Sequence, residues 1–440
     1  MKTNATKERS PAMPPFSDAA KYWLWLGCIS FGGPAGQIAV MHREVVENRR
    51  WIANDHFLHA LNFCMLLPGP EAQQLATYLG WRLHGAKGGI AAGTLFVLPS
   101  MFLLFGLSWL FMVGGSWPWL QGLFYGLNAA VIAVVAEAVL RIGKKALKSP
   151  TLCTMAVLSF VMIYVFHVSF VFLIFGAAWI GWMGKRLAPT QFPAGGGHSS
   201  EKHNDGPVLV LPLVMRASWR RSLMVVATCV TLWILPLIAV ACWLGWHSTA
   251  AQQGLFFSKA ALVTFGGAYA VLPYVAQQAV ETFGWLSHGQ MMSGLGLAET
   301  TPGPLIMVLQ FVGFVGGWQH PGNLSPLAAA TVGALLTTWV TFLPCFLMVF
   351  LGAPHIEKLH KQPRLGAALT AITAAVVGVI LNLAVKFTTH TLLPEPSKAI
   401  DWFAALIAIS AFIALQKYKL SLIPTIATCA LVGLVGRMML

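Results

Sequence analysis

Two stretches of the chain repeat the same unusual set of motifs, and this repetition limits the fold more than any other feature. The first stretch carries Phe-Gly-Gly at residues 31–33, Trp51, and Pro-Gly-Pro at residues 68–70. The second carries the same motifs 234 residues later, at 265–267, Trp285 and 302–304. Identical residues recur at the same offset, namely Val46, Glu47, Leu61 and Leu75 with Val280, Glu281, Leu295 and Leu309. The chain therefore contains two copies of one structural unit.

The duplication continues beyond these motifs. After an 11-residue insertion the alignment resumes at an offset of 245, with residues 98–99 matching 343–344 and residues 129–131 matching 374–376. Gly and Pro interrupt otherwise apolar segments at corresponding positions of both halves. This pattern is typical of secondary transporters whose broken helices build a substrate site.

Composition places the chain in a membrane. Of its 440 residues 57% are hydrophobic and only 10% are charged, so a soluble fold would leave large apolar patches exposed. The net charge of +14 comes from Lys and Arg in short runs between apolar segments, which indicates topology and not nucleic-acid binding. The 7 Cys are scattered without Cys-x-x-Cys or metal-ligand spacing, so we expect no cofactor and no metal.

The apolar stretches predict an all-α polytopic membrane protein. Segments of about 20 residues, enough to cross a bilayer, lie near 17–40, 88–112, 118–141, 151–167, 168–184, 222–246, 251–276, 326–352, 366–388, 400–416 and 420–438. Two more, 58–83 and 290–317, carry Pro-Gly-Pro, which should divide each into two half-helices that meet inside the membrane. Counting each broken helix as one crossing gives 13 transmembrane segments.

Basic residues then set the orientation and the domains. Lys and Arg mark residues 141–148 and the linker as cytoplasmic in the first half, and residues 358–364 and 417–419 in the second. The basic loops of the second half are thus not the equivalents of the basic loops of the first half. They are the alternate connections between helices, as two homologous inverted repeats require. We therefore expect a repeat at 1–184, a cytoplasmic linker at 185–221, a connecting transmembrane helix at 222–250 and an inverted repeat at 251–440, with the N-terminus inside and the C-terminus outside.

Three arginines do not fit this scheme. Arg43, Arg49 and Arg50 fall outside the cell if each broken helix crosses the membrane. If the breaks are instead the tips of re-entrant hairpins, this loop returns to the cytoplasm.

The interrupted helices suggest an anion site. A helix that begins inside the membrane presents unpaired N–H groups and the positive end of its dipole, which attract an anion. Glycine allows close approach to the backbone, and nearby amides and hydroxyls add uncharged donors. The alternative is that these residues only provide kinks and close helix contacts. The candidate substrate-binding residues are Gly32, Gly33, Pro34, Gln37, Pro68, Gly69, Pro70, Gln73, Gln74, Gly266, Gly267, Thr300, Thr301, Pro302, Gly303 and Pro304.

Three charged residues inside apolar spans are candidates for charge balance or proton coupling, because such groups are costly in a bilayer. A carboxylate at Glu71 or Glu299 would repel an anion unless it were protonated or paired. Glu71 could instead stabilise a half-helix N-terminus, and Lys259 could reach an interface instead of the substrate. Glu137 lies one helical turn from Arg141 and is expected to form a local ion pair.

The motifs also resemble a known family. The blocks at residues 31–37, 67–76, 264–269 and 299–304 resemble the chromate ion transporter family, specifically its long two-domain members, over nearly the whole chain except the tail and the linker. The resemblance implies a secondary transporter of the bacterial inner membrane that exports chromate, coupled to the proton motive force as an antiporter, and confers chromate resistance. The expected partners are chromate, with sulfate as its mimic, and the lipid bilayer; a homodimer is an option, and nucleic acid is not a partner.

Other functions stay open at this point. A transporter of sulfate or another oxyanion would share the same backbone chemistry. A membrane-bound chromate reductase would need cofactor ligation, for which the sequence has no Cys-x-x-Cys, haem-attachment or dinucleotide motif. A pore would transport without dependence on a gradient. We therefore expect a transporter and not an enzyme.

Overall fold

A computed structural model describes residues 13–192, 218–355, 362–393 and 399–439. Every regular element in these ranges is a helix, which confirms the all-α prediction. The first repeat comprises α1 (Phe16–Ile29), α2 (Gly33–His42), η1 (Arg43–Asn48), α3 (Asn54–Leu66), α4 (Glu71–Val113), α5 (Pro118–Ala146), α6 (Pro150–Tyr164) and α7 (Phe170–Leu187). Most of the expected linker, residues 193–217, lies outside the described residues.

One helix, α8 (Trp219–Leu244), connects the repeats. The second repeat comprises α9 (Thr249–Val263), α10 (Ala268–Ala276), η2 (Gln277–Thr282), α11 (His288–Thr300), η3 (Leu305–Met307), α12 (Val308–Gln319), α13 (Pro326–Gly352), η4 (Ala353–His355), α15 (Pro363–Leu392), α16 (Trp402–Gln416) and α17 (Leu422–Met439). The duplication is visible in the helix lengths, because α6 and α16 each have 15 residues and α7 and α17 each have 18.

In the second repeat the breaks are the tips of re-entrant hairpins. The Thr249 hydroxyl donates to the carbonyl of His320 at 3.1 Å, so α9 begins beside the end of α12. The His320 ring lies 3.1 Å from the carbonyl of Gly284, in the turn between η2 and α11. The start of α9, the turn between η2 and α11, and the end of α12 therefore lie at one end of the molecule. Consequently α9 runs from this end toward the centre and α10 runs back to it, and α11 and α12 repeat this path.

The first repeat has the same hairpins from the opposite end. The Arg49 guanidinium, just after η1, stacks 5.0 Å from the ring of Tyr22 in α1, so the chain has turned back. Within α4, the backbone reverses at His84 and at Gly85, whose φ is +63°. The two arms of this turn pack so closely that a Cβ on Gly88 would lie 2.2 Å from the carbonyl oxygen of Gly80. Helix α4 is thus a half-helix, 71–83, followed by a long helix, 86–113.

These contacts change the interpretation of the breaks. The count of 13 crossings treated every broken helix as one passage, and it is not confirmed, because Gly and Pro at each tip reverse the chain instead of extending it. The loop with Arg43, Arg49 and Arg50 accordingly returns to the end where α1 begins, which we call the N-side. The opposite end, where α17 finishes, is the C-side.

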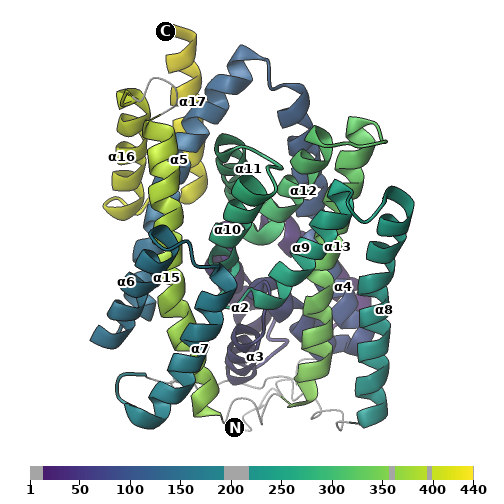
Figure 1. Cartoon of the computed structure of the whole chain (residues 1–440). Coiled ribbons are helices and arrows are strands. Elements are labelled where there is room, and N and C mark those ends of the chain that lie inside the picture. Colours follow the sequence, from purple (N-terminus) through teal and green to yellow (C-terminus); the bar gives the residue numbers. More distant parts are fainter. Residues whose placement is uncertain (1–12, 193–217, 356–361, 394–398, 440) are drawn as a thin grey trace, which may run out of the picture.

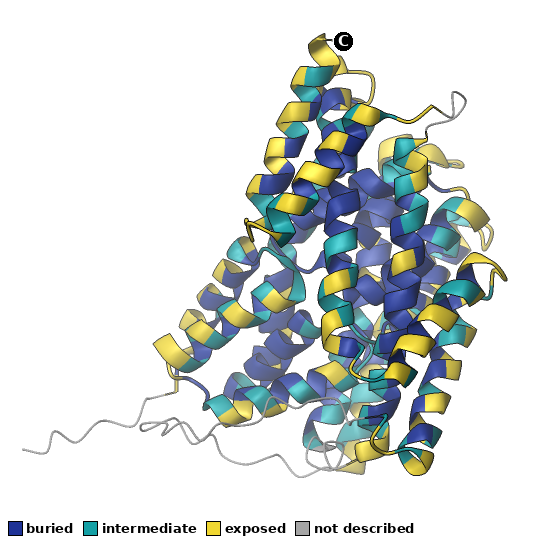
Figure 2. Cartoon of the chain, turned by 90° about the vertical axis from the view of Figure 1, so that its left-hand side faces the viewer, coloured by how far each residue is buried: buried dark blue, intermediate teal, exposed yellow. Residues whose placement is uncertain are grey.

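The hairpins of the two repeats stack one above the other. Helices α2 and α3 occupy the lower half of Figure 1 and α11 and α12 the upper half, while α13 and α15 run through both. In Figure 2 the buried residues gather in the middle of the molecule, and the peripheral helices expose their outer faces. Among the described residues, seven helices are long and apolar enough to cross a membrane: α4, α5, α7, α8, α13, α15 and α17. The chain is therefore a multi-pass membrane protein.

Two shorter hairpins flank this core. The backbone N–H of Asp401 donates to the carbonyl of Leu392 at 2.9 Å, so α16 starts at the C-side end of α15. Fifteen residues of helix rise about 22 Å, roughly half the length of the 30-residue α15. The turn with Lys417 and Lys419, predicted from the sequence to be a cytoplasmic loop, therefore lies about half-way along α15.

Candidate anion-binding site at the helix breaks

Two equivalent backbone hydrogen bonds bring the four helix breaks together. The N–H of Gly69 donates to the carbonyl of Thr264, and the N–H of Gly303 donates to the carbonyl of Ser30, both at 2.7 Å. Each residue of one bond is the repeat equivalent of a residue in the other, at the offset of 234. The Pro-Gly-Pro tip of each repeat thus meets the Gly-Gly break of the other repeat, around a pseudo-twofold axis.

Only glycine fits at the centre of each Pro-Gly-Pro tip. Gly69 has φ of +125° and Gly303 has φ of +104°. A Cβ on Gly69 would lie 2.7 Å from the sulfur of Cys345, and one on Gly303 would lie 2.4 Å from the Cβ of Ser100. Ser100 and Cys345 are themselves equivalent at the offset of 245. The tips are therefore close-packed against the long helices as well as against each other.

The half-helices that begin at the breaks have no side-chain caps. The N-cap residues of α2, α4 and α10 are Gly32, Pro70 and Gly267, and none caps its helix through a side chain. The same is true of Pro304 before η3. Within the part of the chain that the structure describes, five other helices are capped by side chains, namely those of Ser149, Ser248, Ser287, Ser325 and Asp401. Uncapped first-turn amides at the centre of the molecule can bind an oxyanion.

Three buried glutamines surround the breaks. Gln37 donates to the carbonyl of Gly303 at 2.5 Å, which joins α2 to the second Pro-Gly-Pro tip. Gln74 donates to the carbonyl of Pro68 at 2.6 Å, and Gln73 donates to the hydroxyl of Thr77 at 3.2 Å. The other amide atom of each glutamine, like the hydroxyl oxygens of Ser30 and Ser100, has no hydrogen-bond partner among the described residues. Buried polar groups normally have partners. The two serine hydroxyls can donate to a bound oxyanion, whereas the three amide oxygens only accept hydrogen bonds and can bind water.

A chain of polar contacts leads from the second break toward the N-side. The hydroxyl of Tyr269 donates to the carboxylate of Glu299, which is only 3% exposed. The Arg141 guanidinium lies 5.8 Å from the centre of the Tyr269 ring. Arg141 also pairs with Glu137 at 3.6 Å, which confirms the expected local ion pair. Arg141 is thus the cation closest to the buried carboxylate along this chain of contacts.

Sequence reasoning did not select two of these residues as site residues. Tyr269 stands two positions after the Gly266-Gly267 pair, and its place in the motif was the available signal. Arg141 was interpreted as a marker of a cytoplasmic loop and as the partner of Glu137, because its approach to α10 depends on tertiary packing.

Glu71 lies at the other break. It is the first residue of α4, and its Oε1 atom would lie 3.5 Å from a Cβ on Gly267, the N-cap of α10. Its carboxylate therefore approaches the N-termini of two half-helices, where negative charge is favourable. This placement suits both interpretations of Glu71, as a residue that stabilises the helix end and as a group that competes with an anion.

Three predicted residues contribute less directly. The hydroxyl of Thr300 donates to the carbonyls of Gly296 and Leu297, both at 3.0 Å, and that of Thr301 donates to the carbonyl of Ala298 at 3.2 Å. Both hydroxyl hydrogens are therefore used within α11. Lys259 is exposed on α9, between the exposed Leu255 and Leu262, and it does not join the cluster at the breaks. This position favours the interpretation that the charge of Lys259 reaches the membrane interface and not the substrate.

Comparison with known proteins finds one family model that matches this chain twice. The sequence profile of a family described as "Chromate transporter" matches residues 17–182 and 251–434, which are the two repeats. A chromate transport protein of Pseudomonas aeruginosa is 32% identical over 98% of this chain and 95% of its own length. A chromate transport protein of Cupriavidus metallidurans is 31% identical over 94% of this chain and 92% of its own length. No solved structure matches this chain.

Proposed function

The chain belongs to the chromate transporter family, and from this premise we propose that it is a secondary active transporter that exports chromate from the cytoplasm, driven by the proton gradient. In this role it acts as an antiporter, catalyses no covalent step and confers chromate resistance on the cell. The observation that carries the proposal is the meeting of four uncapped helix N-termini at two equivalent backbone hydrogen bonds.

The donors at this centre suit a tetrahedral dianion. Backbone amides at helix ends bind oxyanions through several N–H groups without a full positive charge, and Ser30 and Ser100 add hydroxyl groups that are buried there. Arg141 adds one cation within reach of Tyr269. Because sulfate has the same shape and charge as chromate, it should compete for the same donors.

The proposed orientation places the N-side in the cytoplasm of a bacterial inner membrane. On that side lie the ends or turns with Arg43, Arg49, Arg50, Arg82, Lys87, Lys144, Lys145, Arg220, Arg221 and Arg364. The C-side turns at 114–117, 245–248, 283–287 and 320–325 contain no Lys or Arg. This asymmetry agrees with the positive-inside rule and supports a C-terminus in the periplasm.

Proton coupling is assigned to Glu299. Its carboxylate is buried, accepts a hydrogen bond from Tyr269, and shares that tyrosine with Arg141. An anion that binds Arg141 competes with the carboxylate of Glu299 for the same positive charge. Binding of the anion and binding of a proton to Glu299 then influence each other, as any two coupled sites must.

The test is chromate accumulation in everted membrane vesicles, with and without a proton gradient. We expect gradient-driven accumulation that excess sulfate reduces and that Glu299→Gln abolishes. The matched control is Glu137→Gln, which removes a partly exposed carboxylate next to Arg141 but leaves the bond between Tyr269 and Glu299; it should retain transport. Accumulation that survives both collapse of the gradient and Glu299→Gln would refute the coupling. If the vesicles transport sulfate but not chromate, the proposed substrate is wrong and sulfate takes its place.

A further inference from the structure

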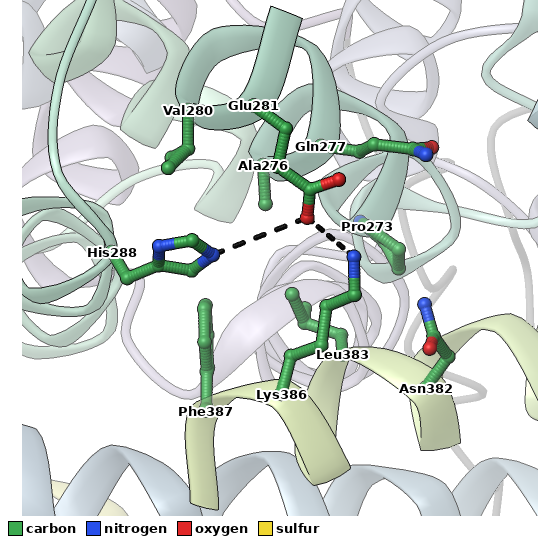
Figure 3. Close-up of a pocket in the computed structure, with 10 residues that line it drawn as sticks. All are labelled: Pro273, Ala276, Gln277, Val280, Glu281, His288, Asn382, Leu383, Lys386 and Phe387. Carbon is green, nitrogen blue, oxygen red and sulfur yellow. Dashed lines mark hydrogen bonds and ion pairs between the residues drawn. The ribbon is translucent and has the colours of Figure 1, made fainter. Parts of the chain in front are cut away.

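A second charged cluster lies at the C-side, away from the helix breaks. Glu281 of η2 accepts a hydrogen bond from Lys386 of α15 and lies 4.0 Å from the ring of His288. Figure 3 shows Glu281 between these two side chains, in a pocket that Asn382 also lines. The ring of His390 lies 5.0 Å from that of His288. The cluster ties the re-entrant hairpin of the second repeat to a long helix.

The first repeat carries the same two charges at equivalent positions. Glu47 is equivalent to Glu281 at the offset of 234, and Arg141 is equivalent to Lys386 at the offset of 245. In both repeats the carboxylate therefore stands on the hairpin and the cation on the long helix. In the first repeat, however, the two do not meet. Glu47 pairs with His42 of its own hairpin at 3.1 Å, and Arg141 pairs with Glu137 of its own helix.

The packing of the hairpins differs in the same way. All nine residues of α10 are buried, whereas only Gln37 and Met41 are buried among the ten residues of α2. Ala35 and Ala39 of α2 are not buried, although they are equivalent to the buried Tyr269 and Pro273 of α10. Glu47 itself is 58% exposed, against 35% for Glu281. One hairpin is therefore closed against its long helix and the other is open.

We propose that Glu281 with Lys386 is an outer gate pair, closed in this structure, and that Glu47 with Arg141 is the inner gate pair, which forms when the outer one separates. Inverted repeats that rock around a fixed site exchange arrangements as the site opens to one side and then the other. The structure then corresponds to the state open toward the N-side. This inference rests on the proposed transport function and deepens it.

The gate also connects to the buried carboxylate. To reach Glu47, Arg141 must leave both Glu137 and the face of Tyr269. Tyr269 in turn holds Glu299. Closing the inner gate therefore removes the cation that Tyr269 shares with Glu299, so the gate and the proton site change together.

Cysteine cross-linking tests the gate without a transported substrate. The background is the full-length protein in membranes, with the exposed Cys28, Cys153 and Cys242 replaced by Ser. One variant tests the inner pair with Glu47→Cys and Arg141→Cys. A second variant tests the outer pair with Glu281→Cys and Lys386→Cys. Two long side chains can form an ion pair while their Cα atoms lie farther apart than the limit of about 7 Å that a disulfide allows, so the two cysteines of each pair are bridged with a short bifunctional thiol reagent. We expect both pairs to cross-link with this reagent. The control is Glu44→Cys with Arg141→Cys, because Glu44 points to Arg49 and Asn48 on its own hairpin; it should not cross-link.

A charge exchange provides a second measurement. An ion pair of this exposure changes an equilibrium about two- to fivefold. Glu281→Lys should lower the transport rate by at least that factor, and adding Lys386→Glu should restore it. Failure of the inner pair to cross-link while the outer pair does would overturn the gate, even if chromate is transported. Conversely, cross-linking of both pairs together with an absence of chromate transport by the unsubstituted protein would refute the proposed substrate and leave the gate intact.

Discussion

Replacing Gly303 with alanine should destabilise the protein through the contact that joins the repeats. Gly303 has φ of +104°, and a Cβ there would lie 2.4 Å from the Cβ of Ser100. A non-glycine residue in this backbone region costs about 1–3 kcal/mol. Overpacking of a close contact adds about 1–3 kcal/mol. We therefore expect Gly303→Ala to lower the free energy of unfolding by about 2–6 kcal/mol.

The measurement is thermal unfolding of the purified protein in detergent, followed by tryptophan fluorescence. Gly106→Ala is the control, because Gly106 lies in the helical part of α4 and a Cβ added there would meet no atom within 4 Å. That variant should be unchanged or slightly stabilised, by up to about 1 kcal/mol. Adding Ser100→Gly to Gly303→Ala should restore the part of the unfolding free energy that is lost to the clash with Ser100. The part lost to backbone strain at residue 303 should remain. If Gly303→Ala unfolds at the same temperature as Gly106→Ala, the inference that the Pro-Gly-Pro tip is close-packed is wrong.

Three further changes test other parts of the reasoning. Tyr269→Phe removes the hydroxyl that donates to Glu299, so transport should fall and its dependence on pH should change, which vesicle uptake at several pH values will measure; an unchanged profile contradicts the coupling chain. Gln37→Leu leaves the carbonyl of Gly303 without its buried donor and should cost about 1–3 kcal/mol of stability in the same unfolding assay, unlike Gln121→Leu, which removes an exposed amide. Gly85 has φ of +63° and ψ of −154° in open space, a backbone region nearly restricted to glycine, so Gly85→Ala should cost about 1–3 kcal/mol; no loss would argue against the sharp reversal within α4.

Much of the fold follows from local sequence. The offsets of 234 and 245 predicted two equivalent units, and the equal lengths of α6 and α16 agree with this. Gly and Pro predicted where helices stop, since proline removes a donor and glycine frees the backbone. The pairing of Glu137 with Arg141 was also predictable, because residues four apart on a helix are neighbours.

The candidate site was predicted less completely. The breaks themselves were identified, but Thr300 and Thr301 bond within their own helix and Lys259 faces outward. These outcomes depend on how a helix is rotated in the bundle. Tyr269 and Arg141 come together from segments 128 residues apart, and no spacing rule connects positions so distant.

The sequence by itself determined that this is a duplicated membrane protein with helix ends inside the bilayer, because repetition, apolar length and helix-breaking residues act locally. Only the tertiary structure decided the direction in which each broken helix continues, since Pro-Gly-Pro ends a helix equally well in a crossing and in a hairpin. Contacts such as that between Gly69 and Thr264 select the hairpin. Likewise, Glu47 and Glu281 occupy equivalent positions in the sequence, yet one is open and the other is paired with its long helix. Equivalent sequences permit both arrangements, and packing against the rest of the molecule selects a different one in each repeat.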